Sequence, residues 1–465
     1  MAAFEADARD AMASSTLPTS RGRRLARLGG LAARLGGNAL GHLGTRITSG
    51  KARALESMHR RAAEQLFETM AEMKGLPMKV GQILSFMDGV VPPEHQAAYA
   101  ELLARLQVRA KPMAWGPMAE VLEAELGRPV DEVFARFERE PIAAASIGQV
   151  YRAELEDPEG ARRVVAVKVQ YPGIAEALRA DLANAGGIAK TLHGMIPGVE
   201  SEVMIADFLA RIGEECDYQR EAENMREFAA RWQGEARVHI PGVVDALCTE
   251  RVLVTEFVDA LSFEAFLAQA SPAQRDAAGE VLFDFVMRSL LREGLFNADP
   301  HPGNFLFTLD PELPAGVRVV FLDFGCVQHF DPEARAALRS VARSILAGER
   351  GEALWRVLRE AMQFPEDTAP TLREIIEDYV LFCFEPAVEA QPYRYTRDYT
   401  SRLSALTFEA KKTIAMNLLR IGWREPKREG LVLLSRILFG LNSVLASLEA
   451  RGQWAATLNR YAVEA

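Results

Sequence analysis

The sequence has few cysteines, and their pattern excludes several protein classes. Cys216, Cys248, Cys326 and Cys383 are scattered over 465 residues, with no CxxC pair and no histidine at metal-ligand spacing. This pattern predicts reduced thiols in a cytosol-like compartment and no zinc site.

Long apolar runs are also missing. No stretch reaches the roughly 18 uncharged apolar residues that a membrane-spanning helix needs. The longest late run, "ILFGLNSVLAS" after Arg436, is short enough to predict a buried helix. Asp7 and Asp10 open the chain without a following apolar core, so we expect no secretory signal.

Acidic residues are absent from Ala11 to Leu55. Leucines recur there at near-helical spacing among basic residues, which favours a helix on an anionic membrane surface. Several glycines in the same stretch favour a solvated leader instead, and an organelle transit peptide has the same composition. The basic residues are Arg21, Arg23, Arg24, Arg27, Arg34, Arg46, Lys51 and Arg53.

The rest of the chain has the composition of a globular protein. Its 49% hydrophobic content can form a large core, and its length predicts two to four folding units. The formal net charge of -10 argues against a nucleic-acid binder that works through overall charge.

Apolar residues alternate with polar ones in several short stretches after Pro141. "SIGQVYRAEL", the turn "EDPEG" and "RRVVAVKVQ" predict an antiparallel hairpin. A helical stretch over about 201–231 precedes a strand in "RVLVTEFV". A second strand pair is predicted in "NFLFT" and "RVVFLDFG", around the turn "DPELPAG", and helices dominate from Asp331 onwards.

In this order the elements match the layout of a protein kinase. Lys168 of "VAVK" would hold the α- and β-phosphates of a nucleotide, and an acid on the next helix would pair with it. In "ADPHPGN", Asp299 would be the catalytic base and Asn304 a Mg²⁺ ligand. Asp323 of "DFG" would hold Mg²⁺ across the phosphates. His301, in the same loop, has two open interpretations, contact with phosphate or a bond to the loop backbone.

The acid that pairs with Lys168 is open. Asp217 and Glu221 share a helix face at i,i+4, and Glu214 lies one turn before Asp217. Glu215 lies about 160° away from Asp217 on an ideal helix.

Several segments together resemble the UbiB-type atypical kinases, a kinase-like family of ubiquinone and other prenyl-lipid metabolism. They are "KVGQ", "PIAAASIGQVYRA", "VAVKVQYPG", "EECDYQREAEN", "ADPHPGN" and "LDFG", over roughly residues 75–330. The resemblance implies an α+β, bilobal protein-kinase-like fold with an N-terminal helical extension packed over the active site. It points to Glu215 and Asp217 as a gating pair that is reached by Lys79 of the "KVGQ" motif. Gly81 and Gln82 belong to the same motif. It leaves Glu221 open as the partner of Lys168.

The resemblance also implies a domain plan and an ATP site. The expected regions are a basic leader (1–55), the helical extension (56–125), a kinase-like N-lobe (126–258) and a helical C-lobe (259–465). The expected ATP-binding residues are Ala143, Ala144, Ala145, Ser146, Ile147, Gly148, Val150, Lys168, Glu256 and Val258.

Three departures from protein kinases bear on mechanism. Alanines stand at 143–145 where kinases have a glycine-rich loop, and each Cβ resists positive φ and a close approach to phosphate. Ala298 stands directly before Asp299, at the position where many kinases have Arg. Only about five residues separate "DFG" from Asp331 and Pro332, a good helix N-cap and N1 pair, so a platform for peptide substrates is not expected.

We therefore expect an atypical kinase-like ATPase or phosphotransferase that uses ATP and Mg²⁺. The alternatives are a small-molecule phosphotransferase of the aminoglycoside or choline kinase type and an ATP-gated scaffold of a biosynthetic complex. The expected partners are ATP, a lipid or quinone precursor and a membrane surface, without nucleic acid. The expected location is cytoplasmic or peripheral membrane, or mitochondrial in a eukaryote.

Overall fold

The computed structural model describes residues 112–145, 147–177, 216–297, 301–407 and 431–463. Within these ranges the chain divides into two compact units. The first unit consists of the described chain up to Ala222 together with Val243–Phe257. The second unit consists of Glu223–Gly242 and the described chain from Val258. Residues 1–111, with the basic leader and the "KVGQ" segment, lie outside the described ranges.

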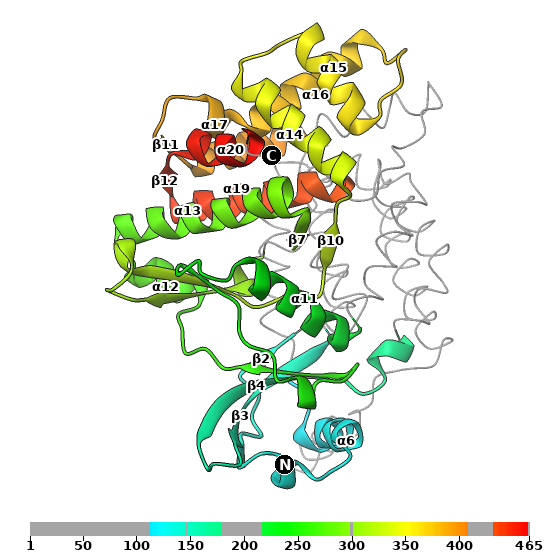
Figure 1. The fold of residues 1–465 in the computed structure, drawn as a ribbon, viewed down its shortest axis with the longest axis vertical. Helices are drawn as coiled ribbons and strands as arrows, with labels where there is room; N and C mark the ends of the chain where they lie inside the picture. The colour runs from blue at the N-terminus through cyan, green and yellow to red at the C-terminus, as the bar shows by residue number, and fades with distance from the viewer. Residues whose placement is uncertain (1–111, 146, 178–215, 298–300, 408–430, 464–465) are drawn as a thin grey trace, which may run out of the picture. The chain divides into compact units, whose positions relative to one another are not determined.

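The first unit is built on an antiparallel sheet (Figure 1). Its strand order is β1-β3-β4-β6, and β2 pairs with the start of β3. The strands are β1 (Arg136–Phe137), β2 (Ala143–Ala144), β3 (Gly148–Glu156), β4 (Arg162–Gln170) and β6 (Val252–Glu256). The hairpin expected from "SIGQVYRAEL" and "RRVVAVKVQ" is confirmed as β3 and β4, and Gly160 adopts a φ of 83° in the turn that joins them.

One face of this sheet is covered by α6 (Trp115–Leu126), which is followed by α7 (Val130–Val133). Met118 and Leu122 of α6 are fully buried, as is Tyr151 of β3. The Trp115 and Tyr151 rings meet edge to face at 5.3 Å. Gln149 ties the chain before α6 to β3, because its side chain accepts from the Met113 N–H (2.9 Å) and donates to the Met113 carbonyl (3.1 Å).

The second unit is mainly helical. Its described helices are α12 (Phe263–Gln269), α13 (Pro272–Arg288), α14 (Pro332–Leu346), α15 (Glu352–Met362), α16 (Pro370–Cys383), α17 (Glu385–Val388), α19 (Leu431–Leu448) and α20 (Trp454–Val463). Helix α13 packs against α19 and α20 (Figure 1). Helix α11 (Tyr218–Arg231) crosses the division between the units after Ala222.

Small sheets complete the second unit. One has the order β5-β9-β8, from β5 (Val238–His239), β8 (Phe305–Leu309) and β9 (Val317–Phe321). The predicted pair of "NFLFT" and "RVVFLDFG" is confirmed as the antiparallel pair β8–β9. The two remaining pairs are β7 (Leu295–Asn297) with β10 (Val327–His329), and β11 (Tyr393–Arg394) with β12 (Arg451–Gly452).

Helix starts follow the local sequence. The predicted cap of α14 is confirmed, because Asp331 accepts from the Ala334 N–H at 2.6 Å and Pro332 occupies N1. Helix α13 begins with a capping box, in which Ser271 and Gln274 each bond the other's backbone. None of the helices in the described ranges has both the length and the apolar character required to cross a bilayer.

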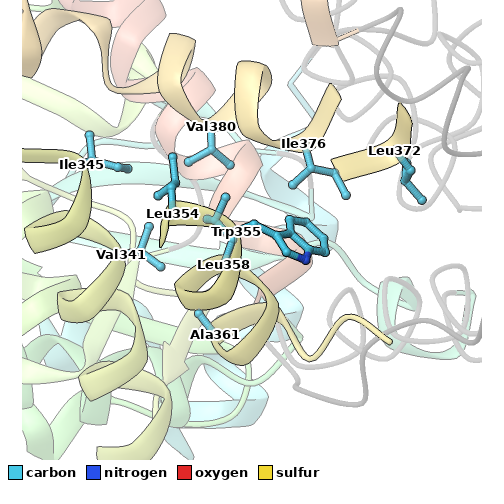
Figure 2. Packing of buried hydrophobic residues seen from close by; sticks show 9 residues of the cluster. All are labelled: Val341, Ile345, Leu354, Trp355, Leu358, Ala361, Leu372, Ile376 and Val380. Atoms are coloured by element: carbon cyan, nitrogen blue, oxygen red, sulfur yellow. The ribbon is translucent and has the colours of Figure 1, made fainter. Parts of the chain in front are cut away.

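The hydrophobic core of the second unit includes a cluster on α14, α15 and α16 (Figure 2). Leu354 and Leu358 of α15 are fully buried, and Trp355 is 3% exposed. The cluster consists of Val341, Ile345, Leu354, Trp355, Leu358, Ala361, Leu372, Ile376 and Val380.

Candidate functional site

Lys168 is held on the central part of the first unit's sheet. On β4 it lies opposite Val150 of β3 and Leu253 of β6. Its ammonium lies 2.8 and 2.9 Å from the two carboxylate oxygens of Glu221, and 4.8 Å from the centre of the Tyr218 ring. The Glu221 side chain is 2% exposed and that of Lys168 is 18% exposed, so this ion pair is largely removed from water.

The local sequence explains this placement. Side chains alternate along β4, so Val167 and Val169 are fully buried on the opposite face from Lys168. Glu221 lies in the first turn of α11, where the helix dipole favours a carboxylate.

The acids left open by the sequence have separate positions. Glu221 contacts Lys168, whereas Asp217 caps α11 by accepting from the backbone N–H groups of Gln219 (3.0 Å) and Arg220 (3.3 Å). Glu214 and Glu215 lie outside the described ranges, as do Lys79, Gly81 and Gln82. The proposed gate of Lys79, Glu215 and Asp217 therefore stays a prediction.

The alanine-rich segment forms a strand. Ala143 and Ala144 are exposed and pair with Val150 and Gln149, and the Ala145 N–H donates to the Gly148 carbonyl at 2.8 Å. The described residues other than glycine with positive φ are all elsewhere, at Ala315, Gln363 and Glu449. The backbone of Ala143–Ala145 is therefore engaged in the sheet, unlike the loop that wraps the phosphates in a protein kinase. Ser146 lies outside the described ranges.

Gly148 is needed for close packing of strands. A Cβ at this position would lie 2.3 Å from the Val169 carbonyl oxygen and 2.9 Å from the Tyr218 hydroxyl oxygen. Any side chain would therefore push β3 away from β4.

The remaining residues of the expected ATP site differ in environment. Ile147 is 4% exposed, and its carbonyl accepts from the Tyr171 N–H. Val150 shares the sheet face of Lys168, since the two are directly opposite. Glu256 ends β6 and is exposed, and Val258, the first residue of the second unit after β6, is half-buried.

The loop before β8 contains three residues that the sequence analysis selected, of which His301 and Asn304 are described. Asn304 ends a short 3-10 turn, Pro302–Asn304, and its N–H donates to the His301 carbonyl at 2.9 Å. The Nδ1 atom of His301 accepts from the Gly303 N–H at 2.9 Å, which fits the backbone-bonding interpretation of this histidine. Asp299 lies outside the described ranges.

The register of β8 and β9 brings Asn304 next to the "DFG" segment. Phe305 pairs with Phe321, and the Leu322 N–H donates to the Asn304 carbonyl at 3.0 Å, directly before Asp323. Asn304 and Asp323 are both half-buried. An amide oxygen and a carboxylate suit Mg²⁺, which is usually bound by one or two carboxylates with phosphate and water. No group of three or more His, Cys, Asp or Glu side chains that could hold a metal occurs in the described ranges.

The backbone around Asp323 is fixed by side chains that the sequence analysis did not select. Asn297 Nδ2 donates to the Asp323 carbonyl, and Asn224 Nδ2 donates to the Phe324 carbonyl at 2.9 Å. The Asp323 carboxylate accepts from the Gly325 N–H at 3.0 Å. Asn224 ends the "EECDYQREAEN" segment, so its place in that segment was the only available signal.

The segment after "DFG" is short and ordered. Val327–His329 form β10, which pairs with β7, and α14 begins directly afterwards with its cap at Asp331.

A small apolar cavity of about 20 Å³ lies in the second unit, with Asn297, Phe305 and Phe321 in its lining. It has room for about one water molecule and is too small for a nucleotide or a lipid.

These features define a kinase-like protein, and comparison with known proteins identifies its family. A family profile described as "ABC1 atypical kinase-like domain" matches residues 105–354, more than half of the 465-residue chain. The chain belongs to this ABC1 (UbiB) atypical kinase-like family, which confirms both the resemblance and the α+β kinase-like fold.

Named relatives support the same placement. The chain is 31% identical over 346 residues to the atypical kinase COQ8B, mitochondrial, of Rattus norvegicus, covering 73% of this chain and 62% of the relative. It is 30% identical over 329 residues to the atypical kinase COQ8, mitochondrial, of Saccharomyces cerevisiae, covering 70% of this chain and 63% of the relative. The chain therefore spans less than two thirds of the length of these relatives.

A solved structure is similar over almost its full length. It is the complex of Rv3197 with erythromycin from Mycobacterium tuberculosis, with 30% identity and a TM-score of 0.57. The similarity covers 88% of this chain and 98% of that one.

Proposed function

We propose that this chain is an ATP- and Mg²⁺-dependent ATPase or small-molecule phosphotransferase that supports ubiquinone or other prenyl-lipid metabolism. The buried contact between Lys168 and Glu221 carries this proposal, because a lysine paired with a helix acid is the arrangement that binds nucleotide phosphates in kinases. Membership of the atypical kinase family supports it, and the COQ8 relatives support the link to ubiquinone.

The chain's own residues would divide the work. Lys168 would bind the α- and β-phosphates, Asn304 and Asp323 would hold Mg²⁺, and Asp299 would accept the proton of the attacking hydroxyl or water. Mg²⁺ would neutralise phosphate charge when bound. The Ala143–Ala145 segment would leave the phosphates less enclosed than a glycine-rich loop does, which favours ATP hydrolysis or a small acceptor over peptide phosphorylation.

Phosphate release tests this proposal. Asp299→Asn should lower phosphate release by about 10²–10⁴-fold while ADP affinity stays near the wild-type value, because a base is needed only in turnover. The assay is run with and without anionic liposomes and a quinone precursor, and we expect both to stimulate the wild type. Loss of ADP binding together with turnover in Asp299→Asn would instead assign Asp299 a structural function.

A phosphotransferase of the aminoglycoside or choline kinase type is the second candidate. The loop "DPHPGN" has the Asp-x-His-x-Gly-Asn pattern of that class, and the similar Rv3197 structure contains erythromycin. Transfer of labelled γ-phosphate to an antibiotic or choline, with no stimulation by liposomes or quinone precursors, would favour this candidate. The third candidate is an ATP-gated scaffold of a biosynthetic complex. Assembly of the complex that depends on ATP binding but not on ATP hydrolysis would favour it.

A further inference from the structure

Two asparagine side chains bond consecutive backbone carbonyls of the "DFG" segment. Asn297 donates to the carbonyl of Asp323, and Asn224 donates to the carbonyl of Phe324. Asn297 ends β7 and Asn224 lies on α11, so two separate elements fix these carbonyls. Asn224 is only 8% exposed, which makes loss of its bond more costly than at the surface.

The two bonds restrict how Asp323 can be oriented. A carbonyl lies in the plane of the peptide bond that follows it, so the bonds fix the peptide planes on both sides of Phe324. The bond from the Gly325 N–H to the Asp323 carboxylate then limits the side chain itself. Together these contacts restrict the orientation of the Asp323 carboxylate.

Other contacts of α11 with the same segment strengthen this restraint. The Phe324 ring is fully buried and lies 4.8 Å from the Phe228 ring. The Glu227 carboxylate lies 3.2 Å from His329 Nε2 on β10. Asn224, Glu227 and Phe228 are spaced at i, i+3 and i+4, so one face of α11 contacts Phe324 and His329.

We propose that Asn224 and Asn297 are positioning residues that hold Asp323 ready to bind Mg²⁺. This inference rests on the proposed function. In this chain the segment after "DFG" is too short to supply a long, reorganising activation loop, and the two amides provide the ordering in its place. Both amides are engaged with backbone carbonyls, so their effect on a bound metal would pass through the backbone of Asp323 and Phe324.

Binding of metal and nucleotide can be measured separately. Asn224→Leu keeps much of the side-chain volume and removes the donor, and Asn224→Ser is a smaller replacement should Leu prevent folding. Melting temperature is recorded with ATP alone and with ATP over a Mg²⁺ titration. We expect both variants to retain the ATP shift without metal and to need at least tenfold more Mg²⁺ for half of the metal-dependent shift. Asn297→Ser should act in the same direction.

Two controls isolate the positioning effect. Glu223→Gln changes an exposed neighbour of Asn224 on the same helix and should keep the wild-type Mg²⁺ midpoint. Leu358→Ala lowers stability in the α14–α16 cluster and should keep the midpoint as well. A folded Asn224 variant with a Mg²⁺ midpoint within twofold of wild type would overturn the inference while leaving the proposed function intact. A wild type without any nucleotide shift would remove the proposed function and this inference with it.

Discussion

The two units hold their candidate site residues by different physical means. In the first unit Lys168 is fixed by a charged partner, Glu221, and by the ring of Tyr218. In the second unit the backbone around Asp323 is fixed by neutral amides, from Asn224 and Asn297. A buried charge is costly when its partner is removed, whereas an amide–carbonyl bond contributes less energy and specifies direction. Substitutions should therefore cost more stability in the first case than in the second, where the main loss should be in metal affinity.

The largest effect is expected from breaking the ion pair. Lys168→Met should lower the free energy of unfolding by about 3–5 kcal/mol, because it leaves the Glu221 carboxylate buried without its lysine. Urea unfolding measures this loss. The double variant Lys168→Met with Glu221→Leu should recover most of it. A Lys168→Met protein as stable as wild type would show that charge does not fix this side chain.

A core substitution that belongs to neither set of residues comes next. Leu358→Ala should cost about 2–5 kcal/mol, because it opens a cavity in the cluster of Figure 2. Urea unfolding and ATP binding are measured on the same sample. Unchanged ATP affinity is expected, and a large drop in affinity would mean that stability and site geometry cannot be separated in the second unit.

Gly148 tests the close packing of β3 against β4 in the sheet of the first unit. Gly148→Ala should destabilise by about 1–3 kcal/mol, because the new Cβ would meet the Val169 backbone. Gly116→Ala is the matched control, since a Cβ at that position in α6 meets nothing within 4 Å and alanine favours a helix. Thermal unfolding of both variants decides the matter, and equal effects would contradict the close approach of β3 and β4.

The smallest effect concerns Glu227. Burial raises the pKa of its carboxyl, but hydrogen bonds from His329 and Arg231 outweigh this, so the pKa is lowered overall. A lowered pKa stabilises the fold above the unfolded-state pKa, and this contribution is lost as the pH falls through the folded-state pKa. Since the pair is partly exposed, we expect Glu227→Gln to cost less than about 1 kcal/mol at pH 7. The difference from wild type should shrink in acid, and urea midpoints from pH 7 to pH 3 measure it.

Local patterns predicted much of the fold. Period-two alternation identified β3 and β4, two short apolar runs around a turn identified β8 and β9, and the Asp331–Pro332 pair identified the start of α14. These features depend on neighbours in the sequence. The order of Lys168, Asn304 and "DFG" also indicated the kinase-like class, which the family match confirms.

Long-range choices could not be predicted in the same way. Several acids near the start of α11 were candidates for Lys168, and the choice of Glu221 depends on how the helix is rotated against the sheet. Asn224 contacts Phe324, 100 residues later in the chain. Its side chain resembles that of any helix asparagine in the sequence, so only the tertiary structure reveals its partner.

Binding of Mg²⁺-ATP by wild type, Lys168→Met and Asp323→Ala tests the central claim most directly. Isothermal titration should show Mg²⁺-dependent ATP binding to wild type, weak ATP binding with or without metal to Lys168→Met, and binding without metal dependence to Asp323→Ala. Asp367→Ala, which removes an exposed carboxylate of the second unit, should behave as wild type. Equal Mg²⁺-ATP affinities for wild type, Lys168→Met and Asp323→Ala would contradict the assignment of a nucleotide site to these residues.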